Sequence, residues 1–139
     1  MKAALICGAL TFLEPTMPPS QIKNCEYVAA RAEADQMDPF LMVALGFYES
    51  AFMGGVKSPQ GAVGFLQVIP KYHCPRGELK KCDTTAAGFR AYRKFYAITG
   101  NHRDALAHYN AGSKPGKTAR RFANRVLGLS KTLRSMVDP

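Results

Sequence analysis

The stretch that most constrains the fold is the uncharged run 40–48, which ends at the single carboxylate of Glu49. Asp38 and Pro39 stand just before this run as a helix N-cap and a first helical residue, so the sequence predicts a helix that begins there. Because the run is apolar on every side, we expect this helix to lie buried at the centre of the domain. It should end near Phe52, since two glycines follow closely.

The rest of the chain is also typical of a mainly α domain. Helical spacing of apolar residues and capping signals predict four further helices: from Ser20 to about Gln36, from Asp83 or Thr84 to Gly100, over 102–110, and from near Lys117 onward. The segment 54–70 differs, because four glycines and two prolines interrupt it. That composition predicts a loop or a short, weak hairpin.

The N-terminal segment 1–19 is apolar and then Pro-rich, and we expect the main domain over 20–139. One lysine, Lys2, is followed by eleven uncharged residues, which is too short a run for a typical transmembrane helix. Two interpretations are equally favoured: a short signal peptide, or an N-terminal element that stays docked on the domain.

The net charge of +9 is concentrated in the second half of the chain. Residues 1–70 include four basic and six acidic residues, whereas residues 71–139 include fifteen basic and four acidic ones. Such a distribution favours an anionic partner (nucleic acid, a membrane surface or an acidic cell-wall polymer), or it only keeps the protein in solution. Nucleic acid is the least favoured partner, because the aromatic residues among the basic ones are spaced for a helix core.

Four cysteines, Cys7, Cys25, Cys74 and Cys82, do not identify the cellular compartment. Cys74 and Cys82 flank a polar loop, and they would form a disulfide in an oxidising space. Free thiols are the alternative in the cytosol. A zinc site that includes His73 is much less favoured, since the spacing fits no usual pair of zinc ligands.

Glu49 is the one acidic residue expected at the end of a buried helix and just before a Gly-rich stretch. Apolar surroundings raise the pKa of a carboxyl group, and a general acid must be protonated near neutral pH. On this evidence alone, a solvent-facing Glu in the last helical turn remains the commoner arrangement. Between Ser50 and Gly77 there is no Asp or Glu, so this segment supplies no carboxylate partner for a glycosidase.

Three separated motifs follow one another in order: Glu49-Ser50, "SPQGAVGFLQVIP" over 58–70, and "AHYNAG" over 107–112. Together they resemble lytic transglycosylases of the soluble-lytic-transglycosylase type, relatives of goose-type lysozyme. The likeness covers about residues 39–129. It implies a lysozyme-like domain that is mainly α (α+β), with a short Gly-rich irregular or β stretch beside the active-site cleft.

The resemblance also implies roles for individual residues. Glu49 would protonate the glycosidic oxygen between N-acetylmuramic acid and N-acetylglucosamine, and would then act as a base toward the sugar's own 6-hydroxyl. The attack is intramolecular, which favours it through proximity, and it leaves a 1,6-anhydro sugar. Five residues would bind or position substrate: Ser50, Phe65, Gln67, Tyr109 and Asn110. Without the likeness, the favoured interpretations are structural: Gln67 as a turn residue, Tyr109 as a core residue and Asn110 as part of a helix C-terminal cap.

The function implied by the resemblance is that of a peptidoglycan lytic transglycosylase for local cell-wall degradation. It implies glycan strands as the partner, and no metal or organic cofactor, no specific nucleic acid and no stable membrane span. We expect action in the bacterial periplasm or cell wall after export or delivery in a phage virion, with other virion or secretion-apparatus proteins as further partners. Met1 slightly favours a phage protein.

Two alternatives remain open: a hydrolytic muramidase, and a non-catalytic wall-binding subunit of a virion or secretion apparatus. One segment also departs from the family pattern. Residues 70–82, "PKYHCPRGELKKC", are more basic and richer in cysteine than the likeness leads us to expect. We interpret them as a groove wall or a docking loop.

Overall fold

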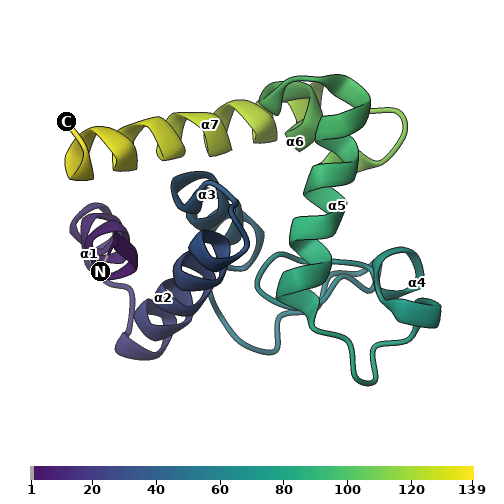
Figure 1. The fold of residues 1–139 in the computed structure, drawn as a ribbon, viewed down its shortest axis with the longest axis horizontal. Coiled ribbons are helices and arrows are strands. Elements are labelled where there is room, and N and C mark those ends of the chain that lie inside the picture. Colours follow the sequence, from purple (N-terminus) through teal and green to yellow (C-terminus); the bar gives the residue numbers. More distant parts are fainter. Residues whose placement is uncertain (1) are drawn as a thin grey trace.

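Helix α3 (Pro39–Ser50) lies near the centre of the protein, where the helices labelled α1, α2 and α7 in Figure 1 pack against it. The structure is a computed structural model that describes residues 2–139. All seven residues from Phe40 to Gly46 are buried. The carboxylate of Asp38 accepts a hydrogen bond of 2.9 Å from the backbone N–H of Phe40, as an N-cap should. The predictions of a central buried helix and of its cap are therefore confirmed.

The prediction of a mainly α fold is also confirmed. The other elements in residues 2–139 are α1 (Lys2–Leu13), α2 (Pro19–Ala34), α4 (Pro70–His73), the 3-10 turn η1 (Pro75–Gly77), α5 (Thr84–Thr99), α6 (His102–Ala111) and α7 (Lys117–Val137). In Figure 1, α1, α2 and α3 form one group of helices, and α5 stands on the other side with α4 near one of its ends. The long helix α7 joins the two sides, since it packs against α6, α3 and α1.

Helix α1 packs on the same core as α2 and α3. Ile6, Cys7 and Leu10 on α1 have no more than 1% of their surface exposed. A disulfide joins Cys7 to Cys25 of α2, with the two Cα atoms 6.0 Å apart. In the structure this segment is docked on the domain, which is one of the two alternatives that we expected. The other alternative, that residues 1–19 are a signal peptide and are removed, stays a prediction.

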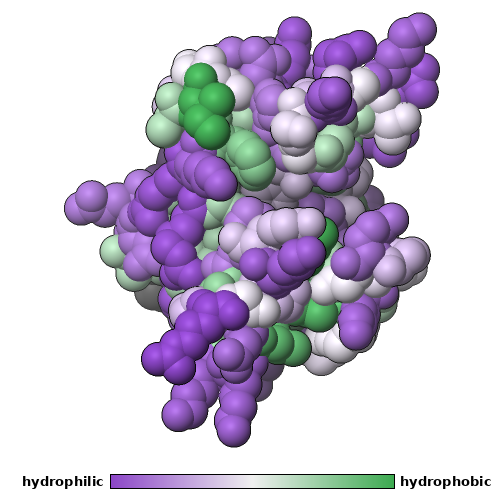
Figure 2. All heavy atoms as spheres, turned by 90° about the vertical axis from the view of Figure 1, so that its right-hand side faces the viewer, coloured by the Kyte–Doolittle hydropathy of each residue, from purple (hydrophilic) through white to green (hydrophobic). Residues whose placement is uncertain are grey.

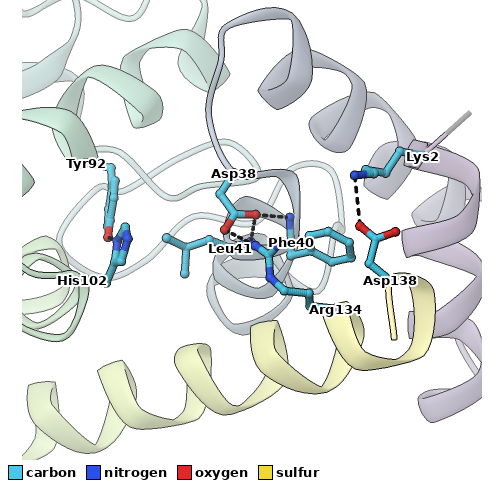
Figure 3. A network of polar contacts seen from close by, with 8 residues as sticks. All are labelled: Lys2, Asp38, Phe40, Leu41, Tyr92, His102, Arg134 and Asp138. Atoms are coloured by element: carbon cyan, nitrogen blue, oxygen red, sulfur yellow. Dashed lines mark hydrogen bonds and ion pairs between the residues drawn. The ribbon is translucent and has the colours of Figure 1, made fainter.

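Polar contacts at the outer edge of α3 connect it to the C-terminal helix (Figure 3). Arg134 of α7 pairs with the Asp38 carboxylate, and its guanidinium lies 4.4 Å from the centre of the Phe40 ring. An ion pair of 3.1 Å joins Lys2 of α1 to Asp138 beyond the end of α7. Exposed pairs of this kind contribute about 0–1 kcal/mol each, so the buried side chains contribute more to the packing of these helices.

The sequence predicted Ser20 as the N-cap of helix α2, but the helix begins two residues earlier than that. Pro18 is its N-cap and Pro19 its first residue, and no side chain caps the N-terminus. The prediction that Ser20 is the N-cap is therefore wrong. The reason is that proline at the first helical position has a suitable φ and needs no N–H partner, so the helix extends past Ser20.

The segment between α3 and α4 is irregular, as predicted. Its only β features within the described chain are two isolated antiparallel bridges, which pair Val63 with Lys57 and with Val68. The extended pieces of this segment are too short and too interrupted by glycines to build a sheet. We call residues 54–69 the Gly-rich loop.

Candidate active site

Glu49 lies in the last turn of α3, one residue before the helix ends. Its side chain is partly buried and lines a cavity of about 820 Å³. Burial raises the pKa of the Glu49 carboxyl to about 8, so this group is protonated at neutral pH. Within residues 2–139 no side chain bonds to Glu49 to offset its lost hydration. The predicted rise in pKa is therefore confirmed.

The backbone just after Glu49 is held in a strained turn. Ala51 and Phe52 have φ angles of 51° and 61°, in the left-handed region that residues other than glycine rarely adopt. The side-chain amides of Gln21 and Asn24 on α2 donate hydrogen bonds of 2.8 and 2.9 Å to the carbonyls of Ala51 and Phe52. Such strain persists only where neighbouring groups fix the backbone, and these bonds do so beside the acid.

The aromatic ring of Phe52 packs against the end of α3 on the side of the hydrophobic core. Phe52 is fully buried. A Cβ added at Gly46 would lie only 2.6 Å from that ring. Glycine at position 46 thus lets the ring pack directly on the α3 backbone, one turn before Glu49, and fixes where the helix ends.

Ser50 fastens the end of α3 to the Gly-rich loop. Its hydroxyl donates a hydrogen bond of 2.8 Å to the Phe65 carbonyl and accepts one of 3.1 Å from the N–H of Phe52. The side chain is buried, and the Phe65 ring packs against Phe52 and Tyr27. The structure therefore places Ser50 and Phe65 behind the cavity, not among the residues that line it.

The Gly-rich loop carries Gln67 to the cavity. Gln67 has a φ of 52°, and its side-chain amide nitrogen donates to the carbonyls of Val56 and Gly64 at 3.0 and 2.9 Å. Because both N–H groups are used, the side-chain oxygen is the group left to accept a hydrogen bond from a ligand. Gly64 has a φ of 82°, and a Cβ there would lie 2.5 Å from the Thr84 hydroxyl, so the loop sits directly against α5.

Helix α6 brings Tyr109 and Asn110 to the same cavity as Glu49. The Tyr109 hydroxyl donates a hydrogen bond of 2.6 Å to the Leu66 carbonyl, which ties α6 to the Gly-rich loop. Burial, with a further contribution from the nearby Glu49 charge, raises the pKa of Tyr109 well above its ordinary value. Asn110 is exposed at the end of α6. Of the residues predicted from the sequence, the cavity thus unites Glu49, Gln67, Tyr109 and Asn110.

Sequence reasoning missed several polar residues that line this cavity: Ser58, Gln60, Tyr72, His73, Lys94 and His108. Ser58 and Gln60 belong to the quoted motif, and Tyr72 and His73 belong to the basic segment that we interpreted as a groove wall. His108 lies within the quoted motif over 107–112, next to Tyr109. Lys94 had no signal, because it reaches the cavity only through the packing of α5. Glu49 is the one acidic residue among the lining residues that the described chain supplies.

The cysteines of the basic segment form the expected disulfide. Cys74 and Cys82 are bonded, with Cα atoms 5.6 Å apart. Their sulfur atoms are therefore unavailable to zinc, and the zinc alternative with His73 is wrong. Across residues 2–139 no group of three or more His, Cys, Asp or Glu side chains is arranged to hold a metal ion.

The described chain is a mainly helical domain whose polar cavity holds one carboxyl group that is protonated at neutral pH, and such a group can act as a general acid. The sequence model of the family described as "Transglycosylase SLT domain" matches residues 26–126. The chain therefore belongs to the transglycosylase SLT-domain family, whose members are lytic transglycosylases that cleave glycosidic bonds in peptidoglycan. No curated protein and no solved structure matches the chain significantly. No helix within residues 2–139 is both long enough and apolar enough to cross a membrane.

Proposed function

We propose that this protein cleaves the β-1,4 bond between N-acetylmuramic acid and N-acetylglucosamine and leaves 1,6-anhydro ends. The observation that carries this proposal is the chemistry of Glu49. Its carboxyl has a pKa of about 8 in a cavity whose described lining includes no second carboxylate. One acid must then perform both proton transfers.

In the proposed reaction, Glu49 alone gives and takes both protons. The protonated carboxyl gives its proton to the glycosidic oxygen, and the N-acetylglucosamine side departs with that proton. The 6-hydroxyl oxygen of the muramoyl residue attacks its own anomeric carbon, and the Glu49 carboxylate takes the hydroxyl proton. No water is consumed, and the acid returns to its protonated form for the next cycle. Since nucleophile and electrophile belong to one sugar, proximity replaces a second catalytic carboxylate.

The neighbouring groups support sugar binding. The free side-chain oxygen of Gln67 and the exposed amide of Asn110 offer an acceptor and further polar atoms to hydroxyl and acetamido groups. Tyr109 holds the Gly-rich loop against α6 through Leu66. We assign Ser50 and Phe65 the task of positioning that loop relative to Glu49, because they lie behind the cavity.

The two disulfides support a place of action outside the reducing cytosol. We therefore propose that the protein degrades the wall locally in the periplasm or cell wall, after export or as a component that a phage virion or a secretion apparatus delivers.

Mass spectrometry of the products tests the reaction. Digestion of purified peptidoglycan should release muropeptides that end in anhydromuramic acid and are 18 Da lighter than hydrolysed ones, because no water is added. Products with only reducing ends would assign a hydrolytic muramidase. Intact peptidoglycan that nevertheless sediments with the protein would assign a non-catalytic wall-binding subunit.

A further inference from the structure

The basic segment 70–82 and the facing side of α5 form one side of the cavity that the reaction proposed above does not use. Lys94 and His73 line the cavity, and Arg90 lies one turn before Lys94 on α5. The Arg90 guanidinium donates a hydrogen bond of 3.2 Å to the His73 carbonyl, and Lys71 is in the same short helix as His73. We call Lys71, Arg90 and Lys94 the cationic wall: Lys94 lines the cavity, whereas Lys71 and Arg90 lie next to its lining residues Tyr72 and His73. The face of the molecule that includes α4 and α5 is predominantly hydrophilic, with long hydrophilic side chains extending from it (Figure 2).

The charges of the cationic wall are not neutralised within the described protein. The ion pairs found in residues 2–139 are Lys2–Asp138, Arg31–Asp83 and Arg134–Asp38, and none includes the wall. Arg90 and Lys94 are four residues apart on one helix, a spacing at which like charges repel. Burial lowers the pKa of His73, and the positive charges of Lys94 and Arg90 lower it further. An anionic ligand would relieve this repulsion.

The wall is also held in place. The disulfide Cys74–Cys82 closes the loop that follows His73. The Arg90 hydrogen bond joins His73, the residue just before this closed loop, to α5, so the backbone segments that carry the wall are held together. A preorganised set of cations binds a flexible anionic chain at a lower entropic cost than mobile ones would.

The lining of the cavity includes groups that match two parts of the substrate. Apart from Glu49, Lys94 and the two histidines, the polar side chains that line it are neutral amides and hydroxyls, which suit the uncharged ring groups of a glycan. Peptidoglycan carries its carboxylates elsewhere, mainly on the peptide stems that hang from the muramoyl residues. We propose that the cationic wall binds the carboxylates of these peptide stems, so that the protein selects stem-bearing glycan over stripped glycan. This inference rests on the proposed function for the identity of the glycan.

Binding measurements test the wall separately from cleavage. The Glu49→Gln protein should be titrated with soluble stem-bearing strands, with the same strands after amidase removal of the stems, and with a neutral chitooligosaccharide of equal length. Amidase cleavage frees the lactyl carboxylate of each muramoyl residue, which is amide-bonded while the stem is attached, so the two kinds of strand separate the two sources of negative charge. We expect stem-bearing strands to bind about tenfold more tightly than stripped ones, as two or three exposed ion pairs would give.

The double substitution Lys71→Gln and Lys94→Gln, added to Glu49→Gln, should reduce this preference to about twofold or less. Both side chains are exposed, and a thermal melt checks that the protein stays folded. The matched control is Arg121→Gln with Arg125→Gln, which removes two exposed charges from α7, away from the cavity, and should keep the full preference.

Three results would overturn the inference. An unchanged preference after the double substitution would show that the wall does not bind stems. A loss of affinity for stripped strands alone would assign the wall to the lactyl carboxylate instead, and equal losses for stem-bearing and stripped strands would show that the wall does not select stems. These tests measure affinities, whereas the proposed reaction is tested by product masses. A failure of this inference can therefore be distinguished from a failure of the proposed reaction.

Discussion

The hydroxyl of Ser50 donates a 2.8 Å hydrogen bond to the carbonyl of Phe65, and so joins the residue after Glu49 to the Gly-rich loop. Ser50→Ala would leave this carbonyl and the Phe52 N–H without a partner in a buried place. We expect a free energy of unfolding lower by about 1–3 kcal/mol, measured by chemical denaturation. Turnover should fall by more than tenfold, because the loop that carries Gln67 loses its fixed position. Wild-type stability and turnover in this variant would show that the contact is incidental.

Tyr109→Phe removes the hydroxyl that bonds to the Leu66 carbonyl at 2.6 Å and leaves the ring in place. The lost hydrogen bond should lower the free energy of unfolding by about 1 kcal/mol. Since the bond holds α6 against the loop opposite Glu49, kcat/KM should fall between tenfold and about a hundredfold. Steady-state kinetics and a melting curve on the same sample separate the two effects. A loss of stability with unaltered kcat/KM would limit Tyr109 to a packing role.

The raised pKa of Glu49 predicts an unusual pH profile for a carboxyl catalyst. A general acid works only while protonated, so kcat/KM should stay level through neutral pH and fall about tenfold per pH unit above about pH 8. Initial rates on soluble glycan strands from pH 5 to pH 10 provide the measurement. A decline that already begins near pH 5 would mean that Glu49 titrates as an ordinary exposed carboxyl.

The same pKa predicts how Glu49 affects stability. Its folded-state pKa of about 8 lies above the value of about 4.3 for an unfolded chain, so between these values the folded state binds more protons. Ionisation therefore lowers the free energy of unfolding as the pH rises through this window. Glu49→Gln should match the wild type near pH 4 and be more stable by up to about 5 kcal/mol above pH 8, since each unit of pKa difference is worth about 1.4 kcal/mol. The exposed Glu33→Gln is the control, and it should show no such trend.

The central helix was predictable because its signals are local. The uncharged run, the Asp38 cap and the position of Glu49 all lie within a few residues of one another, and the structure confirms each of them. The start of α2 was not predictable from the sequence. Pro19 and Ser20 are both good early residues of a helix, and packing decides between them.

The groups that hold the site had no sequence signal. Gln21 and Asn24 bond to the turn after Glu49 from 30 and 28 residues away in the chain. A polar residue on a helix looks the same in the sequence whether it faces solvent or a distant carbonyl. The roles proposed for Gln67 and Asn110 depend on the resemblance for the same reason, although both residues do line the cavity with Glu49.

Substitution of the acid tests the account most directly. Glu49→Gln keeps the size of the side chain but has no acidic proton to give, so digestion of peptidoglycan should fall by at least about a thousandfold and yield no anhydromuramic products above background. Glu33→Gln should digest at the wild-type rate and release the full set of anhydro products. If Glu49→Gln released these products as fast as the wild type, Glu49 would not be the catalytic acid, and the central claim would be contradicted.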